Sequence, residues 1–360
     1  MKNLIVLISV LTIQTGYSQK YELNDFFKYD AHLEQKIDSI FDGLNDTSRV
    51  GQMIIPAAGR LGKSQDHLNA LIAKNYIGGI LLLNGTKEGF TKMVDDFNSL
   101  NSSNNGLPML YSADAEPSLI RYKIKNCAPV KKANAMISRS EVRKFALSIC
   151  NDLQDIGINY NYAPVVDMSP NEAISYRAFG DNADTAQIWS RIFIEETQKE
   201  GIVATAKHFP GHGYVVGDTH KKLVYIDGEM REVENYEPLI EAGVLSVMVA
   251  HIAIKNNPEY NTNDMPSSVS RKIVTDLLKN EMKFKGLVVT DAMNMGGVAS
   301  IPNCELKAAK AGCDLLLMPI DEEKALFDIV GELEKDPLFK QQIYASVRKI
   351  IRLKICLGLI

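Results

Sequence analysis

Apolar residues along the chain follow two alternating patterns. Short runs rich in Val, Ile and Leu alternate with longer stretches in which apolar residues recur every three or four positions. The short runs predict buried strands, and the longer stretches predict amphipathic helices. We expect strands at 51–56, 79–83, 109–113, 159–166, 203–207, 246–250, 287–290 and 314–318. We expect helices at 65–74, 87–100, 139–156, 183–200, 229–242, 271–281, 305–311, 322–334 and 341–357.

The near-continuous apolar character of the strands indicates burial on both faces, as parallel sheets require. Eight such strands alternating with helices predict an α/β fold, a (β/α)8 TIM-type barrel. A doubly wound open sheet is the alternative, which the lack of a Gly-rich phosphate loop after the first strand disfavours. The sequence has no linker, low-complexity tract or short repeat, so we expect residues 19–360 to form a single domain.

The first residues have the pattern of a secretory signal. Lys2 precedes the apolar run 4–13, and Gly16-Tyr17-Ser18 places small residues at −3 and −1 of a cut before Gln19. This run is too short to cross a bilayer, which takes about 20 residues. A buried N-terminal helix is the alternative, but it would show a polar face. We therefore expect a signal peptide at 1–18 and a secreted or periplasmic protein.

Composition narrows the classes of partner. The chain has 46% apolar and 23% charged residues, which is ordinary for a globular protein, and a net charge of −4. The lack of a basic surplus disfavours nucleic acid and anionic membranes, so we expect a small-molecule partner. We also expect no transmembrane segment and a monomer. The odd number of cysteines, at no metal-binding spacing, argues against a disulfide framework or a zinc site. Buried free thiols are expected, although a pair between Cys127 and Cys150 stays open.

Charged residues and histidines directly follow five of the predicted strands. Each of them alone can be explained as a helix N-cap, but together they predict a polar site at the C-terminal rim of the barrel. They are Asp114 and Glu116, Asp167, Lys207 and His208, His251, and Asp291.

The densest polar stretch is Lys207-His208-Phe209-Pro210-Gly211-His212-Gly213, followed after four residues by Asp218-Thr219-His220. With this stretch the chain resembles the glycoside hydrolase family 3 β-N-acetylglucosaminidases. Their signature is Lys-His-(Phe/Ile)-Pro-Gly-(His/Leu)-Gly, four residues, then Asp-(Ser/Thr)-His. Four further segments resemble motifs of that family, so the resemblance runs from about residue 50 to the C-terminus. They are Asn161-Tyr162-Ala163-Pro164-Val165-Val166-Asp167, Tyr176-Arg177-Ala178-Phe179-Gly180, Gly286-Leu287-Val288-Val289-Thr290-Asp291-Ala292-Met293-Asn294-Met295, and Ala311-Gly312-Cys313-Asp314.

One segment departs from the family pattern. After the third strand the family often has Asp-x-Glu-Gly-Gly-Arg, whereas this chain has Asp114-Ala115-Glu116-Pro117-Ser118-Leu119. Asp114 is retained, but the Gly-Gly turn and the arginine are not. We expect this departure to alter the aglycone side of the cleft more than the sugar-binding subsite. We also expect the chain to lack the second αβα domain that many relatives carry.

The resemblance implies a retaining glycosidase with Asp291 as nucleophile and His220, two residues after Asp218, as acid/base. The chemistry agrees, because free imidazole titrates near about 6.5 and a neighbouring carboxylate orients the ring. Glycines at 211, 213 and 217 predict a mobile loop around His220. The same resemblance implies that Asp114, Arg177, Lys207 and His208 bind the hydroxyls of the non-reducing GlcNAc. No cofactor and no metal are implied.

Several alternatives stay open. The nearest are a family 3 β-glucosidase and a β-N-acetylglucosaminide phosphorylase, since a neutral imidazole would not repel phosphate. An inactive carbohydrate-binding barrel is a third, which the intact Asp218, His220 and Asp291 disfavour. The roles of Glu116, Asp167 and His251 are not decided, and Glu116 is the first candidate for the acid if His220 is only structural. For an exported enzyme we expect a peptidoglycan fragment (a muropeptide or other GlcNAc-containing saccharide) as substrate, and hence a role in cell-wall turnover.

Overall fold

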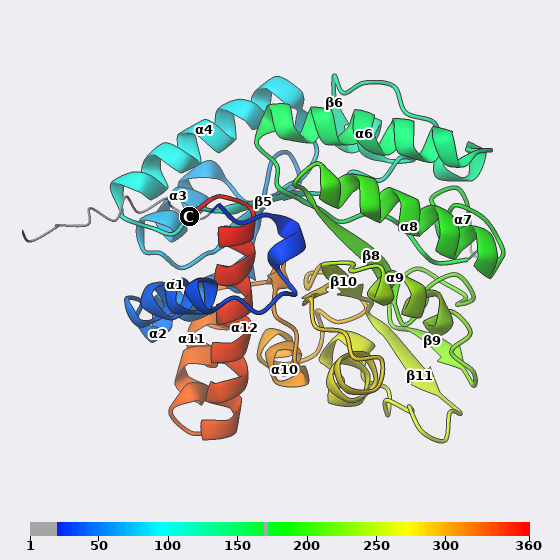
Figure 1. Ribbon diagram of the computed structural model, residues 1–360. Helices are drawn as coiled ribbons and strands as arrows, with labels where there is room; N and C mark the ends of the chain where they lie inside the picture. Colours follow the sequence, from blue (N-terminus) through cyan, green and yellow to red (C-terminus); the bar gives the residue numbers. More distant parts are fainter. Residues whose placement is uncertain (1–19, 169–171) are drawn as a thin grey trace, which may run out of the picture.

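Parallel strands form the centre of the molecule and helices surround them (Figure 1). The structure, a computed structural model, describes residues 20–168 and 172–360. Seven strands hydrogen-bond side by side in one curled parallel sheet. In spatial order they are β12 (Leu287–Thr290), β10 (Ser246–Val249), β8 (Val203–Phe209), β7 (Tyr160–Asn161), β5 (Leu110–Ala113), β3 (Gly79–Leu82) and β2 (Ala57–Ala58).

The remaining two central strands form a separate pair. β1 (Ile54–Ile55) pairs in parallel with β13 (Leu316–Leu317), and a single bridge between Val289 and Leu315 connects this pair to β12. Pro56, which has no backbone N–H, separates β1 from β2 and interrupts the regular ladder. The fold is therefore TIM-barrel-like, as predicted, but the expected closed ring of eight regular strands is not formed.

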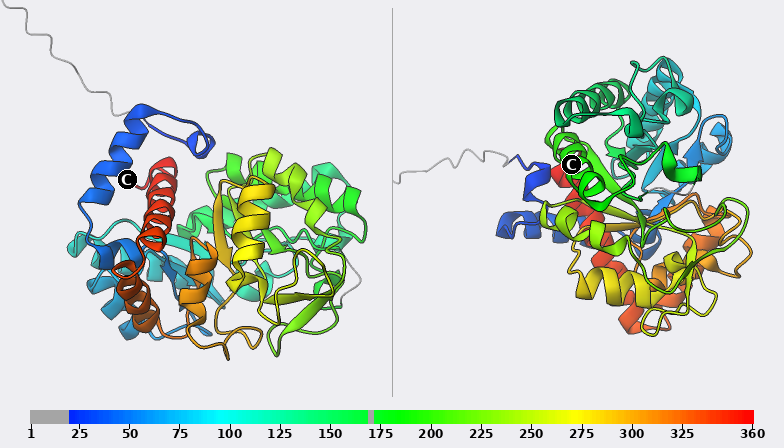
Figure 2. Two further views of the ribbon diagram at one scale, coloured as in Figure 1. Left: turned by 90° about the horizontal axis from the view of Figure 1, so that it is seen from below. Right: turned by 90° about the vertical axis from the view of Figure 1, so that its right-hand side faces the viewer.

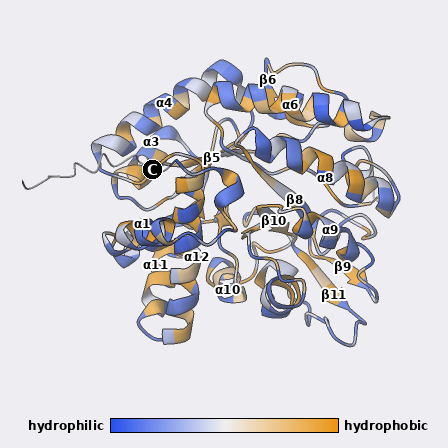
Figure 3. Ribbon diagram, viewed as in Figure 1, coloured by the Kyte–Doolittle hydropathy of each residue, from blue (hydrophilic) through white to orange (hydrophobic). Residues whose placement is uncertain are grey.

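The outer layer consists of amphipathic helices, whose ribbons alternate between hydrophilic and hydrophobic residues (Figure 3). In α6 (Arg139–Ile156) the buried positions Val142, Ala146, Ile149 and Leu153 recur every three or four residues. Ser138 caps its N-terminus, and Gly157, at φ 91°, ends it. The helices α4, α6 and α8 lie side by side on one flank (Figure 1). The remaining long helical segments are α3 (Gln65–Ala73), α4 (Lys87–Ser103), α8 (Ala183–Lys199), the π-helical segment η5 (Lys272–Glu281), α10 (Cys304–Ala311), α11 (Glu322–Leu333) and α12 (Pro337–Cys356).

Elements that the pattern did not predict lie at the start of the described chain and in the loops. α1 (Ala31–Asp42) packs against α12, and the two lie together in both views of Figure 2. A parallel ribbon of β9 (Val224–Asp227) and β11 (Ile252–Lys255) projects beside the rim of the sheet (Figure 1). The others are η1 (Leu23–Asp25), α2 (Asp46–Gly51), the β4 (Gly85–Thr86)–β6 (Ile124–Lys125) pair, α5 (Ile120–Lys123), η2 (Ala133–Ala135), α7 (Glu172–Ser175) and η4 (Ser267–Val269).

Several predicted elements are shorter than expected. The strands predicted at 51–56 and 314–318 pair regularly only in β1 and β13. The helix predicted at 229–242 is divided into η3 (Val233–Asn235) and α9 (Glu237–Glu241), where Pro238 opens the second helix. The strand predicted at 159–166 pairs regularly only in β7, because Pro164 lacks an N–H.

The remaining sequence predictions have different outcomes. All five cysteines are free thiols, so Cys127 and Cys150 are not paired. The predicted signal peptide at 1–18 lies outside the described residues and stays a prediction. Within residues 20–168 and 172–360, no helix is long and apolar enough to cross a membrane.

Candidate active site

A cavity of about 260 Å³ lies at the C-terminal ends of the parallel strands. Its walls include the segments that follow β5 and β12, the end of β8, and the loop between β8 and β9. All seven predicted site residues line this one cavity, although they are spread over almost 180 positions of the chain. They are Asp114, Arg177, Lys207, His208, Asp218, His220 and Asp291.

Asp291 follows β12 directly, and its backbone N–H donates to the carbonyl oxygen of Val249 at 2.9 Å. Its Oδ1 accepts a hydrogen bond from the Ala292 amide at 2.8 Å. Burial opposes ionisation of this carboxyl, but the neighbouring His251 and His208 and the Ala292 amide outweigh that effect and hold its pKa below the usual value. Asp291 is therefore an anion at neutral pH, as an attacking carboxylate must be.

Asp218 and His220 form a hydrogen-bonded pair on the loop that follows β8. Nδ1 of His220 lies 2.9 Å from Oδ1 of Asp218, and the backbone amide of His220 donates to the same oxygen at 3.0 Å. Slight burial raises the pKa of Asp218. The hydrogen bonds from the amide and ring of His220 have a larger, opposite effect, so the pKa lies below its usual value. Because Nδ1 faces the carboxylate, Nε2 is the ring nitrogen that can exchange a proton with a bound molecule. The His220 side chain is 72% exposed, so such a molecule has access to it.

The loop that carries this pair is docked on the segment after Asp291. Gly297 donates its amide to the carbonyl oxygen of Thr219 at 3.0 Å, and Gly296 makes the corresponding bond to His220. The Thr219 hydroxyl also lies 3.2 Å from Nε2 of His212, at the start of the loop. The expected mobility of the loop stays a prediction.

A cluster of paired charges also borders the cavity. The Lys207 ammonium contacts both Asp114 and Glu116, and Arg177 binds Glu116 through two hydrogen bonds of 2.8 and 2.6 Å. Burial opposes the charge of Lys207 and of Asp114, yet their mutual attraction raises the pKa of the lysine and holds that of Asp114 well below its usual range. Asp114, Lys207 and Arg177 line the cavity, so this cluster of ion pairs presents fixed donors and acceptors to it.

Two residues whose roles the sequence left open, Glu116 and Asp167, are buried and hold site residues in place. Glu116 is fully buried between Lys207 and Arg177, which leaves it engaged with two cations. Asp167 accepts from Nδ1 of His208 at 2.7 Å and from the His212 amide at 2.9 Å.

His251, the third such residue, supports the segment after β12. It is buried, with Nε2 3.0 Å from the carbonyl oxygen of Ala292 and Nδ1 2.7 Å from the hydroxyl of Ser268. It therefore fixes the backbone next to Asp291.

Lys123 is a cavity residue that was not predicted from the sequence. This residue, at the end of α5, places its ammonium 3.2 Å from Asp114 and lines the cavity. It supplies a cation where the family's Gly-Gly-Arg pattern is missing. The three basic residues at 121, 123 and 125 were the available signal.

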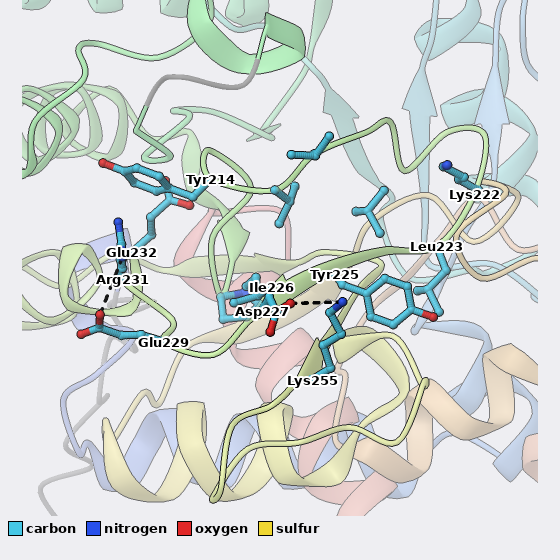
Figure 4. Close-up of a pocket in the computed structure, with 14 residues that line it drawn as sticks. Tyr214, Lys222, Leu223, Tyr225, Ile226, Asp227, Glu229, Arg231, Glu232 and Lys255 are labelled. Atoms are coloured by element: carbon cyan, nitrogen blue, oxygen red, sulfur yellow. Dashed lines mark ion pairs between the residues drawn. The ribbon is translucent and has the colours of Figure 1, made fainter.

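Glu232, which contacts the His220 loop at Gly213, was not predicted either. Its carboxyl is buried and accepts hydrogen bonds from the backbone amides of Met168 and Gly213. It lines a second cavity, of about 530 Å³, to which Tyr214, Val215 and Val216 of the loop also contribute (Figure 4). Nothing in the local sequence marks Glu232, because its partners are backbone groups far along the chain.

The residues that the structure describes contain no group of three or more His, Cys, Asp or Glu side chains placed to hold a metal ion. What the cavity offers chemically is an anionic carboxylate, an imidazole with a carboxylate partner, and a wall of ion-paired donors and acceptors.

This chain, with its TIM-barrel-like fold, belongs to glycosyl hydrolase family 3. The N-terminal domain of that family matches residues 47–353. The chain is 27% identical over 326 residues to beta-hexosaminidase A of Pseudoalteromonas piscicida, covering 80% of this chain and 54% of the relative. It is also 27% identical over 317 residues to a beta-N-acetylglucosaminidase/beta-glucosidase of Cellulomonas fimi, covering 82% and 55% of the two chains.

Among solved structures, a family 3 beta-N-acetylglucosaminidase from Paenibacillus sp. is similar with a TM-score of 0.80 and 26% identity, covering 88% of this chain and 63% of that one. The chain thus spans little more than half the length of these two curated relatives.

Proposed function

We propose that this protein is a retaining exo-β-N-acetylglucosaminidase that removes terminal, non-reducing β-linked GlcNAc. The observation that carries the proposal is the presence of the Asp291 carboxylate and the Asp218–His220 pair on the same cavity. Retaining hydrolysis requires a nucleophilic carboxylate on one side of the sugar and a proton donor on the other. The names of the relatives from Paenibacillus and Cellulomonas support GlcNAc as the sugar, and that of the Pseudoalteromonas relative supports a hexosamine.

In the first step, the Asp291 carboxylate attacks C1 of the sugar while the bond from C1 to the aglycone oxygen breaks. The His220 imidazolium donates its Nε2 proton to the departing oxygen, and the sugar becomes an ester of Asp291. Asp218 keeps the ring in the tautomer and orientation that this transfer needs and stabilises its positive charge.

In the second step, neutral His220 accepts a proton from water as the water oxygen attacks C1. The Asp291 ester bond breaks, the carboxylate is released, and the product keeps the β-configuration. Throughout both steps, Asp114, Arg177, Lys207 and His208 hold the sugar hydroxyls, because their ion pairs fix donors and acceptors in place before the substrate arrives.

A β-glucosidase activity is the second candidate, because the Cellulomonas relative bears both names. A phosphorylase would use the same Asp291 ester but pass the sugar to phosphate. For the biological setting, we propose export through the signal peptide at 1–18, with a mature N-terminus at Gln19, and peptidoglycan fragments as the substrate.

A panel of 4-nitrophenyl sugars, assayed with and without inorganic phosphate, separates these functions. We expect nitrophenol release from the β-GlcNAc derivative to be much faster than from the β-glucoside, with free GlcNAc as product in both buffers. Comparable rates on the two sugars would assign a broad β-glucosidase. A sugar 1-phosphate product would assign a phosphorylase, and no turnover of any sugar would leave only a binding role.

A further inference from the structure

Glu232 joins two segments that belong to different parts of the site. One carboxyl oxygen accepts the amide of Met168, which directly follows Asp167, and the other accepts the amide of Gly213 at 2.8 Å. Burial and the nearby Asp167 raise the pKa of Glu232 to about 8, so the group is mostly protonated at neutral pH. The side chain is buried, so these amides have no access to competing water. The carboxyl of Glu232 therefore ties the end of the fourth predicted strand to the first residues of the His220 loop.

The glycines of the loop follow from this close approach. A Cβ on Gly213 would lie 1.6 Å from the carbonyl oxygen of Met168 and 2.5 Å from a carboxyl oxygen of Glu232. A Cβ on Gly211 would lie 2.6 Å from Glu232. Real Cβ atoms do not come so close to other heavy atoms, so the loop can wrap around Glu232 only with glycine at both positions.

The part of the loop after Gly213 lines the cavity of about 530 Å³ (Figure 4). Its residue Val216 is 94% exposed. Val215 is buried in a small cluster with Val224, Ala250 and Ile252, and the far end of the loop is held by the Gly296 and Gly297 amides. The loop is thus held at its start by Asp167, which accepts the His212 amide, and by Glu232, which accepts the Gly213 amide, and at its end by two backbone bonds.

We infer that Glu232 is a positioning residue for the acid/base group, which acts by fixing the start of the loop that carries Asp218 and His220. The inference rests on the proposed function for its kinetic consequences only. Glu232 does not line the cavity that contains Asp291, so it touches neither the sugar nor the aglycone. Its effect on turnover must pass through the loop.

The clamp itself can be tested without any substrate, by hydrogen exchange and mass spectrometry. In the unsubstituted protein, the segment 211–215 should exchange more slowly than the exposed segment 216–218. Glu232→Gln can accept only one of the two amides, so exchange across 211–221 should be about 10-fold faster. Glu305→Gln is a matched control, because Glu305 is also a buried carboxyl group that accepts a backbone amide, that of Ile320, but lies outside both cavities.

Equal exchange of 211–215 and 216–218 in the unsubstituted protein, or an unchanged loop in Glu232→Gln, would overturn the inference. If Glu232→Gln does not fold, a second variant decides, and unchanged exchange across 211–221 in that variant would overturn the inference. Glu232→Asp then serves as the second variant, since its shorter side chain reaches at most one amide.

The kinetic test compares a GlcNAc–GlcNAc disaccharide, which needs protonation of its leaving group, with 4-nitrophenyl β-GlcNAc, which does not. Glu232→Gln should lower kcat on the disaccharide by about 100-fold, with a much smaller loss on the nitrophenyl glycoside and little change in KM. Glu305→Gln should change neither. Equal losses on both substrates would show a merely structural role. If the unsubstituted protein cleaves neither substrate, the proposed function fails, and the exchange experiment alone judges the clamp.

Discussion

The backbone amide of Gly296 donates a hydrogen bond of 3.1 Å to the carbonyl oxygen of His220. Gly296 lies five residues after Asp291, so the segment that carries the proposed nucleophile also holds the proposed acid/base. The two catalytic groups are therefore positioned against each other by main-chain contacts, and a change at Gly296 should reach the chemistry without touching a reacting atom.

Gly296→Ala should displace the His220 loop. The added Cβ would lie 2.5 Å from the carbonyl oxygen of Lys221 and 2.9 Å from that of His220, so the backbone of the loop must move away. We expect kcat on a GlcNAc–sugar linkage to fall by about 10- to 100-fold. The control is Gly331→Ala in α11, where a Cβ meets no atom within 4 Å. That change should leave kcat unaltered and raise the free energy of unfolding by about 0.5–1 kcal/mol. Equal kcat in both variants would show that the loop does not depend on this contact.

His220→Ala should affect substrates according to the basicity of their leaving group. A sugar alkoxide needs a proton to leave, so the loss on a GlcNAc–sugar linkage should be about 10²–10⁴-fold. A nitrophenolate leaves unaided, so formation of the Asp291 ester should suffer much less. Hydrolysis of that ester, now without a base, should become rate-limiting and produce an initial burst in stopped-flow measurements.

Two further measurements complete the test of His220. Azide needs no deprotonation, so it should accelerate the His220→Ala variant and yield the β-glycosyl azide. Asp218→Asn should show a weaker form of the same pattern, since it perturbs the ring's charge and orientation without removing it. Equal slowing of both substrate types, with neither burst nor azide rescue, would assign His220 a structural role.

Lys354 should make the stability of the protein rise with pH. It is buried at the N-terminal ends of the strands, where its ammonium donates to the Gln52 side chain and to the Gly78 carbonyl oxygen. Burial lowers its pKa from 10.5 to about 7. Between these values the unfolded chain binds a proton that the folded chain does not, so the free energy of unfolding should rise by about 1.4 kcal/mol per pH unit. Below pH 7 both states are charged and this contribution is constant.

Urea unfolding of the parent protein and of Lys354→Met, between pH 6 and pH 9, isolates this effect. The methionine variant lacks the titrating group, so its advantage over the parent should shrink as the pH rises above 7. The difference in free energy of unfolding between the two proteins also includes the cost of leaving the Gln52 and Gly78 acceptors without a donor. That cost does not depend on pH. Parallel pH profiles would contradict a neutral Lys354.

The sequence predicted the cavity residues well because most of them follow strands or lie in one contiguous motif. Asp114, Asp291 and the pair Lys207–His208 come at strand ends, which a parallel barrel-like sheet brings to one rim. Lys123 and Glu232 escaped because their partners are set by tertiary contact. Glu232 accepts hydrogen bonds from two backbone amides, and such partners cannot be identified from the pattern of side chains along the sequence.

The fold was predictable for the same reason, and its prediction was wrong at identifiable places. The helix at 139–156 was predicted with the bounds that α6 has, since both a capping serine and a terminal glycine mark its ends. The β9–β11 ribbon was missed because β9 holds only four residues, two of them half-buried. The closed ring was overpredicted because the apolar pattern does not report that Pro56 interrupts the ladder.

The most direct test of the central claim is to trap the sugar on Asp291. A 5-fluoro derivative of β-GlcNAc with a good leaving group slows both chemical steps but leaves the first fast enough for the ester to accumulate. Peptide mass spectrometry of the trapped protein should find one sugar, on the peptide that contains Asp291, and Asp291→Ala should prevent labelling while keeping the fold. A label on Asp114 or Asp167, or turnover that proceeds with no covalent intermediate, would contradict the account.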